Sequence, residues 1–328
     1  MGLLVDGVWR DDSHDPQRIQ GGRFMRRPSV FRNFITPDGS PGPTGEGGFP
    51  AEPGRYHLYV SLGCPWAHRT VIYRQLKQLE NIISMSGVSW RVDDDGWTFD
   101  TATGSTGDAV NGKSKLHEIY QLADPKVTSR VTVPVLWDKK RATIVNNESS
   151  EIIRMFNSAF DAFTNVHTDY YPAAYRAQID QLNELIYTTV NNGVYRAGFA
   201  TAQDAYEEAA RALFVTLDEL ERRLSRQRYL AGPNLTEADW RLFPTLIRFD
   251  TVYYSHFKCN LRRISDYPNL SNYLRDLYQV PGIAETVSFE HIKKNYYGNQ
   301  VKVNPTRIVP IGPAIDFTEP HDRDRFVS

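Results

Sequence analysis

The spacing of apolar residues predicts alternating strands and helices over the first half of the chain. An alternating run at 56–61 predicts a strand, and helical spacing follows over 65–80. A mixed apolar run at 82–90 predicts a second strand, which completes a β-α-β unit. The elements expected next are a short helix, two strands and a further helix, at 116–122, 131–138, 141–145 and from 148 onward. This pattern indicates an α/β domain.

After about residue 170 the strand pattern stops, and helical periodicity continues to roughly residue 290. A long amphipathic stretch, 205–224, has an apolar stripe at helical spacing. Farther on, Thr236 and Asp239 stand three residues apart before an apolar run, which is the arrangement of a helix capping box. We therefore expect an all-helical second half, in which Asp239 has a structural and not a catalytic role.

Three regions are poor in regular secondary-structure signals. Residues 36–54 are dense in glycine and proline, and several prolines follow residue 298, so an extended arm and an extended tail are expected. The polar, glycine-rich segment 91–113 predicts a long loop, and loops of that length are usually functional. The expected regions are an arm, an α/β domain, a helical domain and a tail, at 1–55, 56–165, 170–298 and 299–328.

Composition narrows the class of protein. Among 328 residues, 38 Lys and Arg balance 39 Asp and Glu, so neither a nucleic acid nor an anionic membrane is an expected partner. The chain has only two cysteines, Cys64 and Cys259, which argues against a disulfide scaffold and for a reducing compartment. The first residues resemble neither a secretory presequence nor a myristoylation signal, and no stretch is long and apolar enough to span a bilayer. These features predict a cytoplasmic location.

Cys64 stands where the first expected strand passes into the first expected helix, directly before Pro65. Proline suits the first helical turn, so Cys64 lies at or beside the N-cap, where its sulfur faces unpaired backbone N–H groups. Those donors and the helix dipole favour a thiolate, which is nucleophilic near neutral pH. With the thioredoxin order of elements, this indicates a thioredoxin-like redox protein or a glutathione-using protein. The alternative is a buried structural cysteine.

A glutathione site also needs an edge backbone and a helix N-terminus. Val133 precedes a proline in mid-strand and offers its N–H and C=O to the cysteinyl part of glutathione, provided that the Val133–Pro134 peptide is cis. Glu148 and Ser149 follow at an expected helix N-terminus, where the dipole favours the ligand carboxylate and Glu148 favours its ammonium group.

Two further candidates are weaker on their own. Arg130 is suited to the glycyl carboxylate, and Trp97 is suited to cover the sulfur from the long loop. The alternative interpretations are a solvated surface charge for Arg130 and a packing anchor for Trp97. His256 and Cys259 suggest a metal pair, but no third or fourth ligand stands at a useful spacing, so core packing is the better interpretation and no metal is expected.

At this level of detail the sequence resembles the two-domain glutathione transferase superfamily and, more narrowly, its xi class, the glutathionyl-hydroquinone reductases. The resemblance covers nearly the whole chain. It rests on five long strings that occur in the same order, GCPWAHR at 63–69, RVTVPVLWD at 130–138, NESSEIIR at 147–154, NGVYRAGFA at 192–200 and RFDTVYYSHFKCN at 248–260. The departure from the family pattern is the loop 91–113, which is long and rich in Asp and Gly.

The resemblance implies a fold and a set of site residues. The fold is a thioredoxin-like α/β domain followed by an all-α domain, and a homodimer is implied. Cys64 is the implied catalytic nucleophile, and the residues implied to hold glutathione are Trp97, Arg130, Val133, Glu148 and Ser149. Three tyrosines, Tyr195, Tyr253 and Tyr296, are implied to line the aromatic substrate pocket. Phenols suit a hydroquinone because they pack against its ring and donate O–H bonds, although ordinary core packing is the alternative interpretation.

The expected reaction is a thiol exchange in two steps. Cys64 takes glutathione from a glutathionyl-hydroquinone as a mixed disulfide, the tyrosines protonate the departing ring carbon, and a second glutathione resolves the disulfide. Position 67 is Ala67, so no resolving cysteine stands in a Cys-x-x-Cys spacing. The alternatives are an omega-like glutaredoxin or dehydroascorbate reductase, which would not require the tyrosines, and a non-enzymatic carrier of aromatic ligands.

Overall fold

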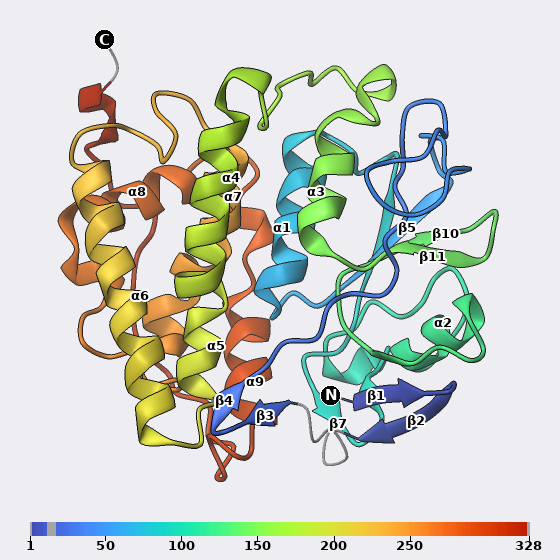
Figure 1. Ribbon diagram of the computed structural model, residues 1–328, viewed down its shortest axis with the longest axis horizontal. Helices are drawn as coiled ribbons and strands as arrows, with labels where there is room; N and C mark the ends of the chain where they lie inside the picture. The colour runs from blue at the N-terminus through green and yellow to red at the C-terminus, as the bar shows by residue number, and fades with distance from the viewer. Residues whose placement is uncertain (1, 12–17, 327–328) are drawn as a thin grey trace. The chain divides into compact units, whose positions relative to one another are not determined.

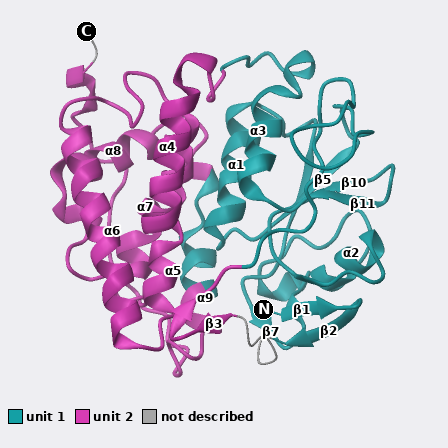
Figure 2. Ribbon diagram, in the orientation of Figure 1, with its two compact units in different colours: residues 1–16, 27–168, 286–295 teal, residues 17–26, 169–285, 296–328 magenta. Residues whose placement is uncertain are grey.

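The computed structural model describes residues 2–11 and 18–326. Residues 1, 12–17 and 327–328, which belong to the expected arm and tail, lie outside the described residues. The chain divides into two compact units (Figure 2). Among described residues, unit 1 comprises 2–11, 27–168 and 286–295, and unit 2 comprises 18–26, 169–285 and 296–326. Each unit therefore combines segments that are far apart in the sequence.

Unit 1 is built on a four-stranded mixed sheet of order β11-β10-β5-β6. Its strands are β5 (Tyr56–Val60), β6 (Ser84–Gly87), β10 (Val135–Asp138) and β11 (Thr143–Asn146). Strand β5 runs parallel to β6 and antiparallel to β10. Every residue of β5 and β10 is buried, so these two strands form the centre of the core.

Three α-helices accompany this sheet, namely α1 (Pro65–Leu76), α2 (Leu116–Ala123) and α3 (Ser149–Ser158). Helices α1 and α3 lie side by side (Figure 1), and α2 contacts β11. The 3₁₀ helices η2 (Thr101–Thr103) and η3 (Asp161–Phe163) also belong to this unit. The thioredoxin-like α/β fold expected from the sequence is confirmed.

The strand expected at 131–138 is interrupted. Strand β9 (Ser129–Arg130) ends before it, and β10 begins only at Val135. The Val133–Pro134 peptide between them is cis, as the sequence interpretation required. Helix α1 also ends earlier than expected, at Leu76, since Gln78 adopts a left-handed φ of 51°.

The N-terminal segment differs from the extended arm expected over 1–55. Strands β1 (Gly2–Val5) and β2 (Val8–Asp11) form a hairpin. Asp6 and Gly7 both have positive φ, at 49° and 76°, which is the geometry of a two-residue Asp-Gly hairpin turn. Strand β1 also pairs with β9, with Leu3 opposite Arg130, so the hairpin and the strand that carries Arg130 form a three-stranded sheet of order β2-β1-β9.

The segment 91–113 is ordered by local contacts. A small hairpin of β7 (Val92–Asp93) and β8 (Gly96–Trp97) opens it. Later in the segment, the Asp108 carboxylate accepts hydrogen bonds from the Tyr59 hydroxyl and from three backbone N–H groups, those of Val110, Asn111 and Lys113. Burial alone would raise the pKa of Asp108, but these donors outweigh it and lower the pKa.

Unit 2 is mainly helical, as expected, and begins with a small hairpin of β3 (Ile19–Gln20) and β4 (Arg23–Phe24). Its α-helices are α4 (Arg176–Ile186), α5 (Gly193–Gly198), α6 (Gln203–Leu224), α7 (Glu237–Arg248) and α8 (Pro268–Tyr278). Helix α9 (Phe289–Asn299) begins in unit 1 and ends in unit 2. The 3₁₀ helices are η4 (Ala173–Tyr175), η7 (Ile264–Asp266), η8 (Ala284–Thr286), which ends in unit 1, and η9 (Arg323–Phe326). Within the described residues, no helix is both long enough and apolar enough to cross a membrane.

Asp239 has the structural role that its sequence context indicated. Its carboxylate accepts from the Thr236 backbone N–H at 2.8 Å, which forms the capping box at the start of α7. The same carboxylate accepts from the Leu230 N–H at 2.9 Å and from the Tyr273 hydroxyl at 2.8 Å. Asp239 therefore ties α8 and the preceding loop to the start of α7.

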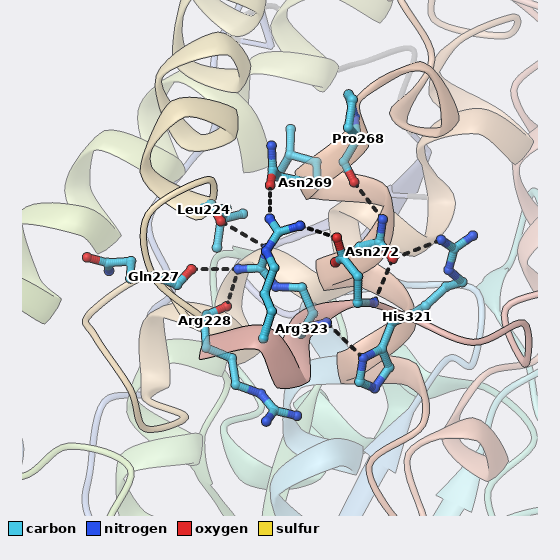
Figure 3. A network of polar contacts seen from close by, with 12 residues as sticks. Leu224, Gln227, Arg228, Pro268, Asn269, Asn272, His321 and Arg323 are labelled. Atoms are coloured by element: carbon cyan, nitrogen blue, oxygen red, sulfur yellow. Dashed lines mark hydrogen bonds and ion pairs between the residues drawn. The ribbon is translucent and has the colours of Figure 1, made fainter. Parts of the chain in front are cut away.

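The C-terminal tail docks on unit 2 through a polar network (Figure 3). The buried Arg323 guanidinium donates to three backbone carbonyls at and beyond the end of α6, those of Leu224, Gln227 and Arg228. These are carbonyls without helical partners, so the arginine acts as a C-terminal cap supplied from about one hundred residues away. The tail, which contains the short 3₁₀ helix Arg323–Phe326, is thus held against the end of α6.

Two buried histidines predict an acid-sensitive fold. Burial lowers the pKa of both His57 and His256 to about 4 from the usual 6.5. Between these values the unfolded chain binds protons that the folded chain does not, so stability falls as the pH drops from 6.5 toward 4. We expect each histidine to cost roughly 2–3 kcal/mol over this window.

Urea unfolding at pH 7.5 and pH 4.5 measures this effect. His57→Gln removes one titrating group and retains a polar partner for Ser84, whose Oγ lies 2.8 Å from His57 Nδ1. The variant is expected to lose less unfolding free energy on acidification than the wild type. If His57→Gln showed the same pH dependence as the wild type, His57 would not contribute to the loss of stability at low pH.

Candidate active site

Cys64 lies at the N-cap of α1, as predicted, with Pro65 in the first helical turn. Its backbone is extended, with φ of −82° and ψ of 124°, and the residue is partly exposed. The backbone carbonyl of Cys64 accepts from the His68 N–H at 3.0 Å, which is the first helical bond of α1. The thiol therefore stands where the unpaired N–H groups of a helix favour an anion.

The cis-proline loop lies beside this thiol. Cys64 Sγ is 3.7 Å from the carbonyl oxygen of Val133, close enough for a weak S–H hydrogen bond. Val133 itself is buried, at 5% exposure. The structure thus brings together the expected nucleophile and the backbone expected to pair with the cysteinyl part of glutathione.

Glu148 is the N-cap of α3, and Ser149 is its first residue. One Glu148 oxygen accepts from the Ser150 N–H at 3.1 Å, and the other accepts from Ser29 Oγ at 3.0 Å. Burial would raise the pKa of Glu148, but the hydrogen bonds from Ser150 and Ser29 and the positive charge of Arg69 lower it. The carboxylate is therefore an anion at neutral pH, with acceptor capacity left for an ammonium group.

Arg130 and Trp97 lie on two short strands of unit 1. Arg130 ends β9 and is half-buried, opposite Leu3 of β1. Trp97 ends β8 and is buried, and its indole Nε1–H has no hydrogen-bond partner among the described residues. A buried unpaired donor is costly, so an acceptor from a ligand would satisfy it.

In unit 2, the three predicted tyrosines form one hydrogen-bonded cluster. Tyr296 Oη lies 2.5 Å from Tyr195 Oη and 2.8 Å from Tyr253 Oη, and all three residues are buried. Burial raises the pKa of Tyr253 and of Tyr296 well above 10, so these phenols are protonated at neutral pH. Two mutual bonds use two of the three hydroxyl protons, and the third hydroxyl can donate to an acceptor outside the cluster.

Two π-helical turns place this cluster. The turn η5 (Tyr187–Asn191) precedes the short helix that carries Tyr195, and the turn η6 (Phe249–Tyr253) ends at Tyr253. An extra residue in a helical turn rotates the side chains that follow, and such turns are frequent at functional sites. No local sequence pattern indicated either turn.

Several residues near the site were not singled out from the sequence. Arg69 is buried, lies over the Trp66 ring at 4.7 Å and donates to Ser149 Oγ at 3.5 Å, so it links α1 to the start of α3. In unit 2, the Arg26 guanidinium lies 5.1 Å from the centre of the Tyr195 ring. Arg69 stands inside the motif string 63–69, whereas no motif string contains Arg26.

His256 and Cys259 pack in the core of unit 2. His256 Nε2 lies 3.0 Å from the side-chain oxygen of Gln300, and burial raises the pKa of the Cys259 thiol. Within residues 2–11 and 18–326, no group of three or more His, Cys, Asp or Glu side chains is arranged to hold a metal ion.

Gly63, directly before Cys64, lies against the start of α9. A Cβ at this position would stand 2.8 Å from Asn295 Cβ and 3.0 Å from the His291 carbonyl oxygen. We expect Gly63→Ala to lower the unfolding free energy by about 1–3 kcal/mol through overpacking. We also expect slower alkylation of Cys64 by iodoacetamide, because the turn must shift the thiol away from the helix end.

The matched control is Gly298→Ala on α9, where an added Cβ meets nothing within 4 Å. Denaturant unfolding and the alkylation rate are measured on both variants. Equal behaviour of the two would contradict the close approach at Gly63.

Family models match the region of the α/β unit that contains Cys64 and a region of the helical unit. Residues 63–159 match the family model of the glutathione S-transferase N-terminal domain, and residues 203–276 match that of the C-terminal domain. The chain is 58% identical to the glutathionyl-hydroquinone reductase YqjG of Escherichia coli over 325 residues, covering 99% of each chain. It is 52% identical to the glutathionyl-hydroquinone reductase PcpF of Sphingobium chlorophenolicum over 314 residues, covering 96% of this chain and 97% of PcpF.

Solved structures give the same grouping. The glutathione-bound structure of Escherichia coli YqjG superposes with a TM-score of 0.91 at 55% identity, covering 98% of this chain and 99% of YqjG. The xi class glutathione transferase of Natrialba magadii has a TM-score of 0.91 at 50% identity, covering 99% and 97% of the two chains. The protein therefore belongs to the glutathione S-transferase family and, within it, to the xi class.

Proposed function

We propose that this protein is a glutathionyl-hydroquinone reductase, which removes glutathione from glutathionyl-hydroquinones. One observation carries the proposal. Cys64 is a partly exposed thiol at a helix N-terminus, while the only other cysteine, Cys259, is fully buried in unit 2. A thiol that reacts here has no partner cysteine at hand, so an external thiol must complete the cycle. The relatives YqjG and PcpF bear the name of this activity.

The first step is attack by the Cys64 thiolate on the glutathione sulfur of the substrate. The bond between that sulfur and the ring carbon breaks, and its electron pair passes to the ring carbon. A proton from the tyrosine cluster completes the hydroquinone, and Cys64 remains as a mixed disulfide with glutathione. The protonated state of Tyr253 and Tyr296 suits this donor role.

In the second step a glutathione thiolate attacks the mixed disulfide. Oxidised glutathione leaves, and the Cys64 thiolate is restored. One glutathionyl-hydroquinone and one glutathione thus give one hydroquinone and one glutathione disulfide. Ordinary conjugation is disfavoured because it uses a Tyr or Ser hydroxyl to stabilise the glutathione thiolate, whereas the Cys64 thiolate would itself attack the sulfur of the adduct.

Five residues are proposed to hold glutathione. The Val133 backbone pairs with the cysteinyl part, and Glu148 and Ser149 at the start of α3 bind the γ-glutamyl ammonium and carboxylate groups. Arg130 and the unpaired indole N–H of Trp97 supply donors for further carboxylate or carbonyl groups of the peptide. Residues 56–165 are proposed to form the glutathione-binding domain and residues 170–298 the substrate domain.

A cytoplasmic homodimer is the proposed setting. Neither cysteine takes part in a disulfide, and the second step consumes reduced glutathione, which suits a reducing compartment. Light scattering during gel filtration tests the dimer.

The reaction is tested by intact mass spectrometry after mixing the protein with glutathionyl-hydroquinone in the absence of free glutathione. We expect the mass of the protein to increase by one glutathionyl group and one equivalent of hydroquinone to appear. Added glutathione should then make the release catalytic, with one glutathione disulfide per turnover. A protein that reduces dehydroascorbate but leaves the aromatic substrate unchanged would favour the omega-like alternative, and a protein with neither activity would contradict the proposal.

A further inference from the structure

The side chain of Tyr120 connects two loops that the proposed glutathione site uses separately. Tyr120 belongs to α2 and is fully buried, with no role in the reaction described above. Its hydroxyl donates to the carbonyl oxygen of Thr132 at 2.9 Å and accepts from the Thr132 N–H at 3.3 Å. The same oxygen accepts from Asn147 Nδ2 at 3.1 Å. One phenol therefore binds the residue before Val133 and the residue before Glu148.

The bonds leave Tyr120 and Asn147 with fixed orientations. Asn147 Oδ1 accepts from the Phe31 N–H at 3.2 Å, so its amide nitrogen is directed to Tyr120. The Asn147 carbonyl oxygen accepts from Ser29 Oγ, which also donates to Glu148. The Phe31 ring packs edge-on against the Tyr120 ring, with centroids 5.8 Å apart. The phenol is thus saturated, with one donated and two accepted bonds, and cannot turn without breaking them.

Because Tyr120 is fully buried, losing these hydrogen bonds would cost free energy. Burial raises the pKa of Tyr120, so the hydroxyl stays protonated and remains both donor and acceptor. Removing the hydroxyl would leave the Thr132 backbone groups and the buried Asn147 amide without this partner. The two loops would then lose their common anchor, while their separate attachments to β10 and to α3 remain.

We propose that Tyr120 is a positioning residue for glutathione, which fixes the spacing between the Val133 backbone and the start of α3. This inference rests on the proposed glutathione site. A tripeptide that spans both loops binds only when the cysteinyl and γ-glutamyl contacts form together, so its affinity depends on that spacing. Chemistry at Cys64 does not depend on Tyr120 directly, because the hydrogen bonds of the phenol go to Thr132 and Asn147 and none joins it to the thiol among the described residues.

Tyr120→Phe tests the inference by calorimetric titration with glutathione, in a Cys64→Ser background that prevents disulfide formation. We expect about tenfold weaker binding, the loss that leaving buried partners unsatisfied commonly causes. In the enzyme with Cys64 intact, the KM for glutathione should rise by a similar factor, while kcat at saturating glutathione and the rate of Cys64 alkylation stay within twofold.

The matched control is Tyr56→Phe. Tyr56 is also fully buried in unit 1, and its hydroxyl donates to the Pro50 carbonyl oxygen at 2.7 Å, away from both loops. This variant should bind glutathione as its parent does. If Tyr120→Phe does not fold, Asn147→Asp carries the test, because it keeps the acceptor for the Phe31 N–H and removes the donor to Tyr120.

The inference is overturned if Tyr120→Phe binds glutathione within twofold of its parent, or if Tyr56→Phe is weakened equally. Direct binding of glutathione separates this result from the fate of the proposed reaction. If the Cys64→Ser protein binds glutathione but the protein with Cys64 intact does not reduce glutathionyl-hydroquinone, the proposed function is contradicted and the role of Tyr120 is not. A parent that does not bind glutathione would overturn both.

Discussion

Replacing Cys64 with serine is expected to abolish glutathionyl-hydroquinone reduction, with a loss of at least about 10³-fold in kcat. A serine hydroxyl at the N-cap of α1 is not ionised at neutral pH and cannot form a disulfide with glutathione. The proposed first step therefore has no nucleophile. Glutathione binding should persist, because Val133, Glu148 and Ser149 are unchanged.

The other cysteine supplies the control. Cys259 is fully buried and its thiol pKa is raised by burial, so Cys259→Ala should retain the activity and the glutathione adduct on Cys64. Hydroquinone release and intact mass are followed for both variants. Residual turnover of Cys64→Ser within tenfold of wild type would show that the cysteine is not the nucleophile.

The sequence indicated the Cys64 end of the site well, because the information there is local. A strand, a cysteine, a proline and a helix in succession place the thiol at a helix N-terminus without knowledge of the remaining fold. The same holds for Glu148, which the structure shows as the N-cap of α3, and for the capping box of Thr236 and Asp239. Local hydrogen-bonding rules decide each of these positions.

The contacts that stabilise the start of α3 and the C-terminal tail are long-range, and no local pattern reveals them. Ser29 reaches Glu148 across 119 residues, and Arg323 reaches the end of α6 across 99 residues. The N-terminal hairpin was missed for a different reason. Its Asp6–Gly7 turn is a recognised hairpin signal, but four-residue strands are too short to stand out against the glycine-rich and proline-rich segment that follows.

The tyrosine cluster lies between these cases. A resemblance to the xi class implied roles for Tyr195, Tyr253 and Tyr296, whereas core packing was the better interpretation of any one of them without the motifs around it. The structure gathers the three hydroxyls into one hydrogen-bonded group, which a shared role in proton donation requires. The π-helical turns that align them depend on tertiary packing, which explains why helical periodicity did not predict them.

Tyr296→Phe is expected to have the largest effect among substitutions outside Cys64. Tyr296 is the central phenol, bonded to both Tyr195 and Tyr253, so its removal breaks the cluster into two separate hydroxyls. We expect about a 10²-fold loss of kcat with glutathionyl-hydroquinone, the scale of a lost general acid. Reduction of a non-aromatic mixed disulfide of glutathione should be nearly unchanged, because its leaving group is a thiolate that needs no proton on carbon.

The adjacent residue gives a matched control for this substitution. Tyr297 is also buried on α9, but its hydroxyl contacts the Thr251 carbonyl oxygen at 3.1 Å and Ser255 Oγ at 2.5 Å, not the cluster. Tyr297→Phe removes the same atom from the same helix and should keep the activity on both substrates. If Tyr296→Phe lowered both activities equally, the cluster would be a packing element and the omega-like chemistry, which requires only Cys64, would be favoured. If Tyr296→Phe lowered only the activity on the aromatic substrate, the phenols would be assigned as the donors of the proton to the ring carbon.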